Sequence, residues 1–312
     1  MANYDLFGNV VVEPNSLKEK YISPPFSIFD TASGDWQKRK NKWKNLGIKS
    51  EVGRGNSNTN QRMTQDGKMI GLKPKKTSTI RLEATGRDIT KTPYVSIFDP
   101  VLCEVIYNWF AIKGGTILDP FAGGSVRGIV ANYLDYQYTG IELRERQVLS
   151  NQSQGLEITP NNRPEWIVGD SNKKLNNFDR TFDFIFSCPP YYDLETYCDD
   201  PNDLSNMPYS DFNRVYQSII SKSCKLLRDN RFACFVVGNI RNKNGFMVDL
   251  VGQTIKSFEN AGLKFYNEII LRNPVASASM RADGNMTYKK VVKIHQNVLV
   301  FIKGNPKLFI NP

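Results

Sequence analysis

The sequence lacks the residues and runs that several protein classes need. It has a single histidine, His295, and its five cysteines include no Cys-x-x-Cys pair, so we expect no zinc site of the usual spacing. Reduced thiols and a cytoplasmic setting are expected with that cysteine usage. No run approaches about 18 apolar residues, and the first residues show no basic-then-apolar signal pattern. These absences predict a protein that is neither secreted nor membrane-spanning.

Charge of one sign is concentrated at the two ends of the chain. The 312 residues carry a net charge of +10. Basic residues exceed acidic ones by 7 over residues 1–90 and by 7 over residues 241–312, whereas acidic residues exceed basic ones by 4 over residues 91–240. Hydrophobic residues make up 40% of the chain, which is enough for a substantial core. Basic ends around a folded centre favour a nucleic acid partner over a merely solvated surface.

The pattern along the chain changes near residue 92. Residues 1–90 read as a basic, irregular extension with one helix at 35–46, and from about residue 92 helices and strands alternate at short spacing. We predict a Rossmann-like α/β fold in residues 91–304, with a seven-stranded, mostly parallel sheet and helices on both faces. A basic insertion at 272–295 joins the last two strands without a clear helix, and residues 305–312 form a tail. The expected strands are 116–119, 136–142, 166–170, 182–187, 232–238, 264–271 and 297–303.

Three successive strands of this pattern end in an acidic residue. Asp119 ends the first and is followed by Pro-Phe-Ala-Gly-Gly, a turn whose glycines allow backbone to approach a ligand. Glu142 ends the second, where a carboxylate can accept ribose hydroxyls, and Asp170 ends the third, where it can accept from an adenine amino group. Together they predict a nucleoside-binding edge of the sheet.

A second motif, Cys188-Pro189-Pro190-Tyr191, follows the segment 182–187, which is predicted to be a buried strand. The paired prolines stiffen the turn and remove backbone donors, so that carbonyl groups can face a ligand. The motif therefore marks a ligand-facing loop at the end of a buried strand.

With these two motifs in this order, the chain resembles the DNA amino-methyltransferase family over about residues 92–304. The resemblance implies an enzyme that uses S-adenosylmethionine, with Phe98 to Leu102 leading into the cofactor loop. It places Asp119, Phe121, Gly123 and Gly124 on the methionine side, Glu142 at the ribose and Asp170 at the adenine. It also implies that a carbonyl, here that of Pro189, accepts from the exocyclic amine of a flipped base in double-stranded DNA, while Tyr191 stacks on that base. Ser125 departs from the family's usual glycine.

Cys188 departs further, because the family has Asp, Asn or Ser there and a thiol is a poorer acceptor. One reading is methylation of adenine N6 or cytosine N4 oriented mainly by Pro189. The other is methylation of cytosine C5 with Cys188 as nucleophile and Asp193 and Glu195 as proton partners. A catalytically inactive DNA-binding protein on this scaffold and an RNA methyltransferase are further alternatives. Restriction-modification is one expected setting, and the sequence specifies neither the recognition site nor the oligomeric state.

Several other segments are candidates for the substrate side. Ser23-Pro24-Pro25-Phe26 fits the catalytic consensus but follows no buried strand, so we expect an extended segment packed on the core. Residues 199–206 are acidic and polar, as suits a lid, and His295 is expected to be structural. DNA contacts are predicted for the basic residues of the first helix and of the insertion, namely Lys38, Arg39, Arg272, Arg281, Lys289 and Lys290.

Overall fold

An eight-stranded sheet forms the centre of the computed structural model, which describes residues 16–48, 98–192, 200–275 and 278–309. The strand order is β1–β9–β10–β6–β5–β2–β3–β4. β10 runs antiparallel to both of its neighbours, and the other pairings are parallel. The strands are β1 (Ile28–Asp30), β2 (Thr116–Asp119), β3 (Gln137–Glu142), β4 (Glu165–Val168), β5 (Phe182–Ser187), β6 (Leu227–Val237), β9 (Lys264–Arg272) and β10 (His295–Lys303).

The chain winds through this sheet in two directions from its middle. It leaves β2 toward one edge through β3 and β4, then returns to β5 on the other side of β2. Such a reversal opens a crevice at the carboxyl ends of the two central strands. The Rossmann-like α/β fold predicted from the sequence is confirmed. The predicted count of seven strands is one short, because the extension before residue 90 contributes β1 to the edge of the sheet.

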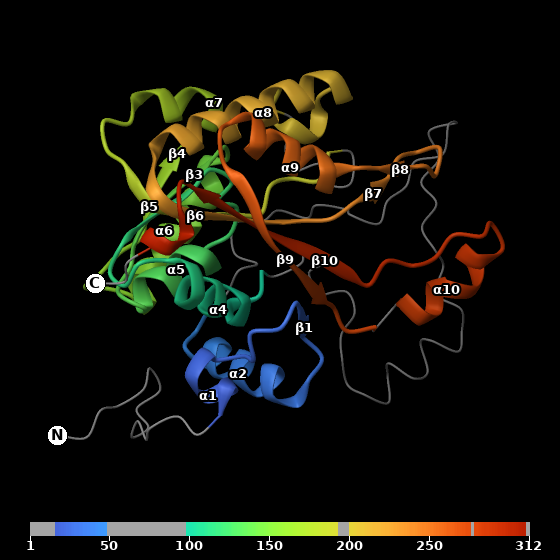
Figure 1. Cartoon of the computed structure of the whole chain (residues 1–312), viewed down its shortest axis with the longest axis horizontal. Coiled ribbons are helices and arrows are strands. Elements are labelled where there is room, and N and C mark those ends of the chain that lie inside the picture. The colour runs from blue at the N-terminus through green and yellow to red at the C-terminus, as the bar shows by residue number, and fades with distance from the viewer. Residues whose placement is uncertain (1–15, 49–97, 193–199, 276–277, 310–312) are drawn as a thin grey trace.

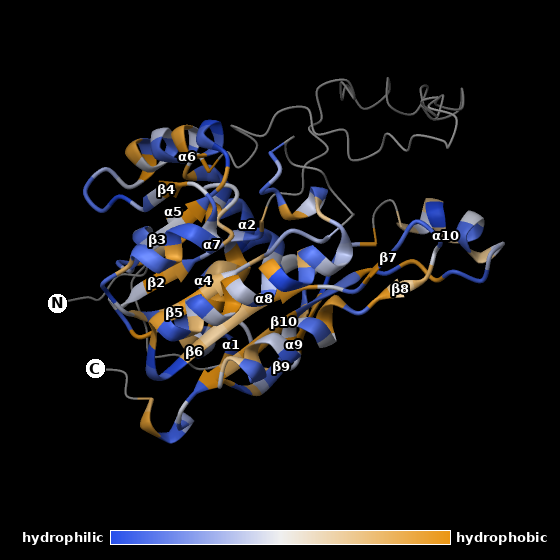
Figure 2. Ribbon diagram, turned by 90° about the horizontal axis from the view of Figure 1, so that it is seen from above, coloured by the Kyte–Doolittle hydropathy of each residue, from blue (hydrophilic) through white to orange (hydrophobic). Residues whose placement is uncertain are grey.

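Helices cover both faces of the sheet (Figure 1). One face packs against α2 (Gly34–Asn45), α4 (Pro100–Phe110), α5 (Val126–Tyr133) and α6 (Glu145–Ile158), and the other against α7 (Ser171–Lys174), α8 (Tyr209–Leu226) and α9 (Leu250–Asn260). Along β5 the side chains of Phe184 and Phe186 enter the first core, and that of Ile185 enters the second. Figure 2 shows the apolar residues gathered on the central strands. A strand buried on both faces explains why apolar residues occupy consecutive positions 184–186.

The described part of the N-terminal extension, which also contains α1 (Leu17–Tyr21), is docked on α4. Asp99 accepts hydrogen bonds from Trp36 Nε1 at 3.1 Å and from Lys40 Nζ at 2.8 Å. Glu104, which is fully buried, accepts from Trp43 Nε1 at 2.8 Å and is paired with Arg39. The helix expected at 35–46 is present as α2, and the described part of the extension also contains α1 and β1. Asp99, which caps α4, and Glu104 hold α2 in place. Residues 1–15 and 49–90 lie outside the described ranges.

Two segments leave the body of the molecule beside each other (Figure 1). The first is the hairpin of β7 (Ile240–Arg241) and β8 (Met247–Val248), which follows β6. The second is the 272–295 insertion, which contains α10 (Ala278–Met286), so the expected absence of a helix between the last two strands is corrected. We call the hairpin and this insertion the arm. The expected tail packs in part on the body, since the ring of Phe309 lies 5.3 Å from that of Phe232. None of the helices described is long and apolar enough to span a membrane.

Candidate active site

The turn after β2 is fixed from both sides by side chains of neighbouring elements. Gly123 has a φ of +54°, a conformation that glycine adopts without a Cβ penalty. Its N–H donates to Glu142 Oε2 at 3.0 Å, and its carbonyl accepts from Asn151 Nδ2 at 2.8 Å. The turn is thus held between the end of β3 and the side of α6.

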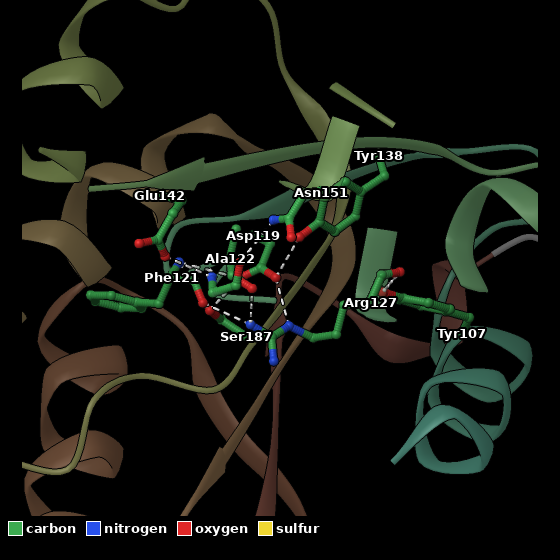
Figure 3. Close-up of polar contacts among 10 residues, drawn as sticks. Tyr107, Asp119, Phe121, Ala122, Arg127, Tyr138, Glu142, Asn151 and Ser187 are labelled. Atoms are coloured by element: carbon green, nitrogen blue, oxygen red, sulfur yellow. Dashed lines mark hydrogen bonds and ion pairs between the residues drawn. The ribbon is translucent and has the colours of Figure 1, made fainter. Parts of the chain in front are cut away.

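Asp119 lies beneath this turn, at the centre of a buried polar network (Figure 3). Its Oδ2 accepts from Arg127 Nε at 2.6 Å and from Tyr138 Oη at 2.7 Å, and its Oδ1 accepts from Ser187 Oγ at 2.5 Å. The side chain has no exposed surface. The geometry therefore gives Asp119 a positioning role, which differs from the direct cofactor contact expected from the sequence.

Arg127 completes the network and was missed by the sequence analysis. From α5 it donates to the carbonyls of Phe121 at 2.7 Å and Ala122 at 2.8 Å, and its guanidinium lies 4.6 Å from the ring centre of Phe98. Burial alone would lower the pKa of Arg127, but the charge of Asp119, the hydrogen bond to it and the nearby Tyr138 and Cys188 together outweigh burial, and the pKa is raised. The available sequence signal was an arginine inside the apolar run Val126–Ala131, which requires a buried partner.

Glu142 and Asp170 lie at the carboxyl ends of adjacent strands, as predicted. Besides its contact with the turn, Glu142 accepts at Oε1 from the backbone N–H of Arg144 at 3.0 Å and from Arg144 Nε at 2.9 Å. Asp170 caps α7 by accepting from the N–H of Asn172 at 2.8 Å. The next residue, Ser171, donates its hydroxyl to the carbonyl of Pro120 at 2.5 Å, which ties this strand end to the first turn.

The Cys188–Tyr191 loop continues from the end of β5, on the opposite side of the same crevice. Pro189 is buried and Cys188 is half-buried. Tyr191 accepts a hydrogen bond at its hydroxyl from Gln296 Nε2 at 2.6 Å. Gln296 belongs to β10 and was not singled out in the sequence, because nothing local indicates that β10 reaches this loop. The loop is thus anchored to the far half of the sheet.

One cavity of about 500 Å³ brings the two predicted motifs together. It is lined by five of the six predicted cofactor residues, all but Asp119, and by all four residues of the second motif. Asn202 to Leu204 also line it, as expected of a lid, and so do Phe98 and Asp99. Among the described residues, Ser23 to Phe26 do not line it, and Phe26 is 64% exposed rather than packed on the core. Asp193 and Glu195 lie outside the described ranges.

The predicted DNA contacts divide into two groups. Arg39 is paired with buried Glu104, and Arg272 Nη1 lies 2.6 Å from Asp30 Oδ2, so both guanidinium groups hold the fold together. The others are basic side chains on the surface of α2 or of the arm: Lys38, Arg281, Lys289 and the half-exposed Lys290. Both charges thus already have an internal partner, and their contact with DNA stays a prediction.

His295 starts β10 opposite Arg272, and burial followed by the charge of Lys293 lowers its pKa. It does not line the cavity within the described part of the chain. That part also contains no group of three or more His, Cys, Asp or Glu side chains arranged to hold a metal.

Comparison with known proteins gives structural likenesses only. No protein-family model and no curated protein sequence matches the chain. The crystal structure of TrmN from Thermus thermophilus is 14% identical, with a TM-score of 0.44 over 66% of this chain and 49% of that one. A methyltransferase from Pyrococcus furiosus is 16% identical, with a TM-score of 0.44 over 73% and 94%. A putative RNA methyltransferase, PH1948 from Pyrococcus horikoshii, is 14% identical, with a TM-score of 0.41 over 65% and 83%.

This chain thus spans about half the length of the Thermus protein. The fold assignment rests on the strand order and not on these likenesses.

Proposed function

We propose that this protein is an S-adenosylmethionine-dependent methyltransferase that acts on the exocyclic amine of adenine (N6) or cytosine (N4) in a base rotated out of double-stranded DNA. The observation that carries the proposal is the shared cavity. A glycine turn and two strand-end carboxylates form one side of it, and the Cys188–Tyr191 loop forms the other. Group transfer requires two reactants to be held side by side, and the two sides of this cavity can each bind one of them.

The cofactor side fits the chemistry of an adenosine-containing ligand. A volume of about 500 Å³ suits a small-molecule site. A carboxylate offers about four acceptor positions, of which hydrogen bonds from Gly123 and Arg144 use three in Glu142, so one ribose hydroxyl can be held directly. A second hydroxyl would replace one bond from Arg144. Asp170 would accept from the adenine amine, and Phe121, Gly123 and Gly124 would hold the methionine side. When bound, the cofactor supplies a methyl group on a cationic sulfur.

The other side of the cavity is assigned to the target base. The carbonyl of Pro189 would accept a hydrogen bond from the amine and so fix the direction of its nitrogen. The ring of Tyr191, held by Gln296, would stack on the base. Asp119 and Arg127 act as positioning residues, because they bind the two loops to each other beneath the cavity. These contacts would orient the two reactants toward each other.

The choice of DNA rests on charge around the site. The arm leaves the rim of the cavity at Asn273 and Pro274 and carries Arg281, Lys289 and Lys290 on its surface. Exposed basic side chains beside a base pocket suit a phosphate backbone, and Lys38 offers a further contact. RNA stays the alternative substrate, since phosphates do not identify the sugar.

A second candidate, methylation of cytosine C5, is favoured by one observation. The buried cation of Arg127 lines the same cavity as Cys188, and the two groups interact electrostatically. A neighbouring cation stabilises a thiolate, which is the form that attacks a ring carbon. The Cys188→Ser variant distinguishes the two candidates. If the protein methylates an amine, the variant keeps its activity; if it methylates cytosine C5, the variant loses it.

The test is to identify the product nucleoside. The protein is incubated with cofactor and either plasmid DNA or RNA, and the nucleosides are analysed by mass after digestion. N6-methyladenosine or N4-methylcytidine in their deoxy forms supports the proposal, and 5-methyldeoxycytidine supports the second candidate. Products in RNA alone, or none at all, would refute it. Tyr191→Ala serves as the impaired variant, and Phe26→Ala, in the other Pro-Pro segment, as the matched control.

A further inference from the structure

The hairpin of β7 and β8 ends in an ordered tip that presents apolar side chains to solvent. Phe246 is 71% exposed and Met247 is 52% exposed. Figures 1 and 2 show the hairpin projecting from the body beside α10, at a distance from the apolar centre of the sheet. These side chains therefore stabilise neither core of the described structure, and their exposure carries a hydration cost.

The tip is held in place by its own hydrogen bonds. The N–H of Phe246 donates to Asn242 Oδ1 at 3.0 Å, and its carbonyl accepts from the N–H of Asn242 at 2.9 Å. Gly245, at φ +85°, supplies the left-handed turn residue, and its carbonyl accepts from Arg241 Nη1 at 2.8 Å. The backbone on both sides of Phe246 is thus constrained, so the Cα–Cβ bond of this residue has a defined direction.

The surroundings of the tip are basic. Residues 239–248 and 273–295, which make up most of the arm, contain six Lys or Arg and one acidic residue. Lys290 lies directly against the turn, since a Cβ added at Gly245 would be 2.6 Å from its Nζ, and that Nζ is 5.8 Å from the ring centre of Tyr288. An aromatic tip among cations complements a partner that offers flat rings and phosphates together.

The hairpin is also connected to the cavity wall. Lys293 Nζ donates to the carbonyl of Asn239, at the base of the hairpin, at 3.4 Å. Three residues later on the same segment, Gln296 lines the cavity and binds Tyr191. A duplex that delivers a base to the cavity would therefore meet the arm at neighbouring positions.

We propose that Phe246 is a wedge that inserts between base pairs of duplex DNA close to the base held in the cavity. Apolar side chains inserted into a base step unstack it and kink the duplex, at a cost that added contacts offset. Met247 would widen the wedge, and Arg241 and Lys290 would meet the flanking phosphates. This inference rests on the proposed DNA substrate and adds a contact that separates two base pairs.

Insertion unwinds DNA, which can be measured without knowing the recognition sequence. Plasmid is relaxed by a topoisomerase with the full-length protein bound, the protein is removed, and the superhelical turns are counted on a gel. Binding to duplex DNA is measured in parallel by fluorescence anisotropy across a series of salt concentrations. We expect the wild type to leave turns in proportion to bound protein. Phe246→Ala should lose at least about four-fifths of that unwinding, whereas Phe246→Trp should keep it.

Two control variants separate stacking from charge. Phe246→Ala should bind about tenfold more weakly with an unchanged salt slope, because a stacking contact is lost and no phosphate contact is. Arg281→Gln, on α10, should lower the salt slope by about one and keep the unwinding per bound molecule. Met280→Ala removes an equally exposed apolar side chain, 81% exposed on the same helix, and should change neither quantity.

Three other results would contradict the wedge, each for a different reason. Wild-type binding with equal unwinding by Phe246→Ala overturns the wedge and leaves the proposed function standing. An absence of wild-type DNA binding refutes the DNA substrate itself. If sedimentation shows a dimer that Phe246→Ala dissociates, the tip contacts a second copy of the chain and the wedge is wrong.

Discussion

Arg127 and Asp119 form an ion pair, with Nε and Oδ2 2.6 Å apart, in which neither side chain is more than 6% exposed. The pair joins α5 to the end of β2, and Nη2 of the same guanidinium donates to the carbonyls of Phe121 and Ala122 in the turn after β2. The floor of the candidate active site is therefore built on a buried ion pair. Removing one partner alone would leave the other charge buried and unpaired.

Asp119→Asn is expected to lower the free energy of unfolding by about 3–5 kcal/mol, since it leaves Arg127 as an uncompensated buried cation. Urea denaturation followed by circular dichroism would measure the loss. Asp211→Asn removes one partner of the exposed Arg214 pair and should cost less than about 0.5 kcal/mol. Equal effects of the two substitutions would contradict the role assigned to the buried pair.

Glu142→Gln is expected to weaken the binding of S-adenosylhomocysteine about 10- to 100-fold, because a neutral amide replaces a charged acceptor of hydroxyl groups. Isothermal titration calorimetry would give the dissociation constants. Glu145→Gln makes the same chemical change three residues later on the exposed surface of α6, and its affinity should match that of the wild type. Unchanged binding by Glu142→Gln would remove the ribose contact from the proposal.

Tyr191→Phe is expected to lower the methylation rate about threefold, since it loses the hydrogen bond from Gln296 but keeps the ring. Tyr191→Ala should lower it at least about tenfold, because base stacking is lost as well. If Tyr191 Oη and Gln296 act only through their shared hydrogen bond, removing both partners costs no more than removing one. The double variant Tyr191→Phe with Gln296→Ala should then be no slower than the slower single variant. Strictly additive losses would indicate that Gln296 acts independently.

Glu104→Gln is expected to loosen the docking of α2, because Arg39 loses its counter-charge in a partly buried position. Amide hydrogen exchange, resolved by peptide, should become faster in α2 and stay unchanged in α8. Asp35→Asn, also on α2, breaks the solvent-exposed pair with Lys18 of α1 and serves as the control. Faster exchange throughout the protein would indicate a global loss of stability instead.

Asp183 is expected to limit stability in acid. Burial alone would raise its pKa, but hydrogen bonds from Thr116 and Arg228 outweigh burial and hold the pKa below the ordinary 3.8. A lowered folded-state pKa contributes stability that is present above pH 3.8 and lost as pH falls through the folded value. The free energy of unfolding of Asp183→Asn should therefore approach that of the wild type as pH falls below about 4. A constant difference from pH 7 down to pH 2 would refute this.

Much of the site was visible in the sequence because its signals are local. The run 182–187 is buried along its whole length, and four of its six residues are apolar. Glu142 ends its strand and Asp170 follows its strand by two residues, so strand counting alone placed both acids at one edge. Cys188 to Tyr191 follow the run without a gap. These features depend on residues a few positions apart, which is the range over which sequence patterns are informative.

Residues that act over long sequence distances could not be found in this way. Arg39 and Glu104 are 65 positions apart, and Tyr191 and Gln296 are 105 apart. A count of basic residues along the sequence could not show that Arg39 is paired with the buried carboxylate of Glu104. The hairpin was missed for a different reason. Its two strands, Ile240–Arg241 and Met247–Val248, have two residues each, which is too short for a periodic signal.

By itself, the sequence determined the class of fold, the order of the two motifs and the acidic strand ends, because hydrophobic periodicity and turn chemistry are properties of short segments. Only the tertiary structure decided that both motifs open into one cavity, that Asp119 supports the turn from beneath, and that Arg127 and Gln296 complete the site. Those outcomes depend on which distant groups share a buried space, where each polar side chain must find a partner.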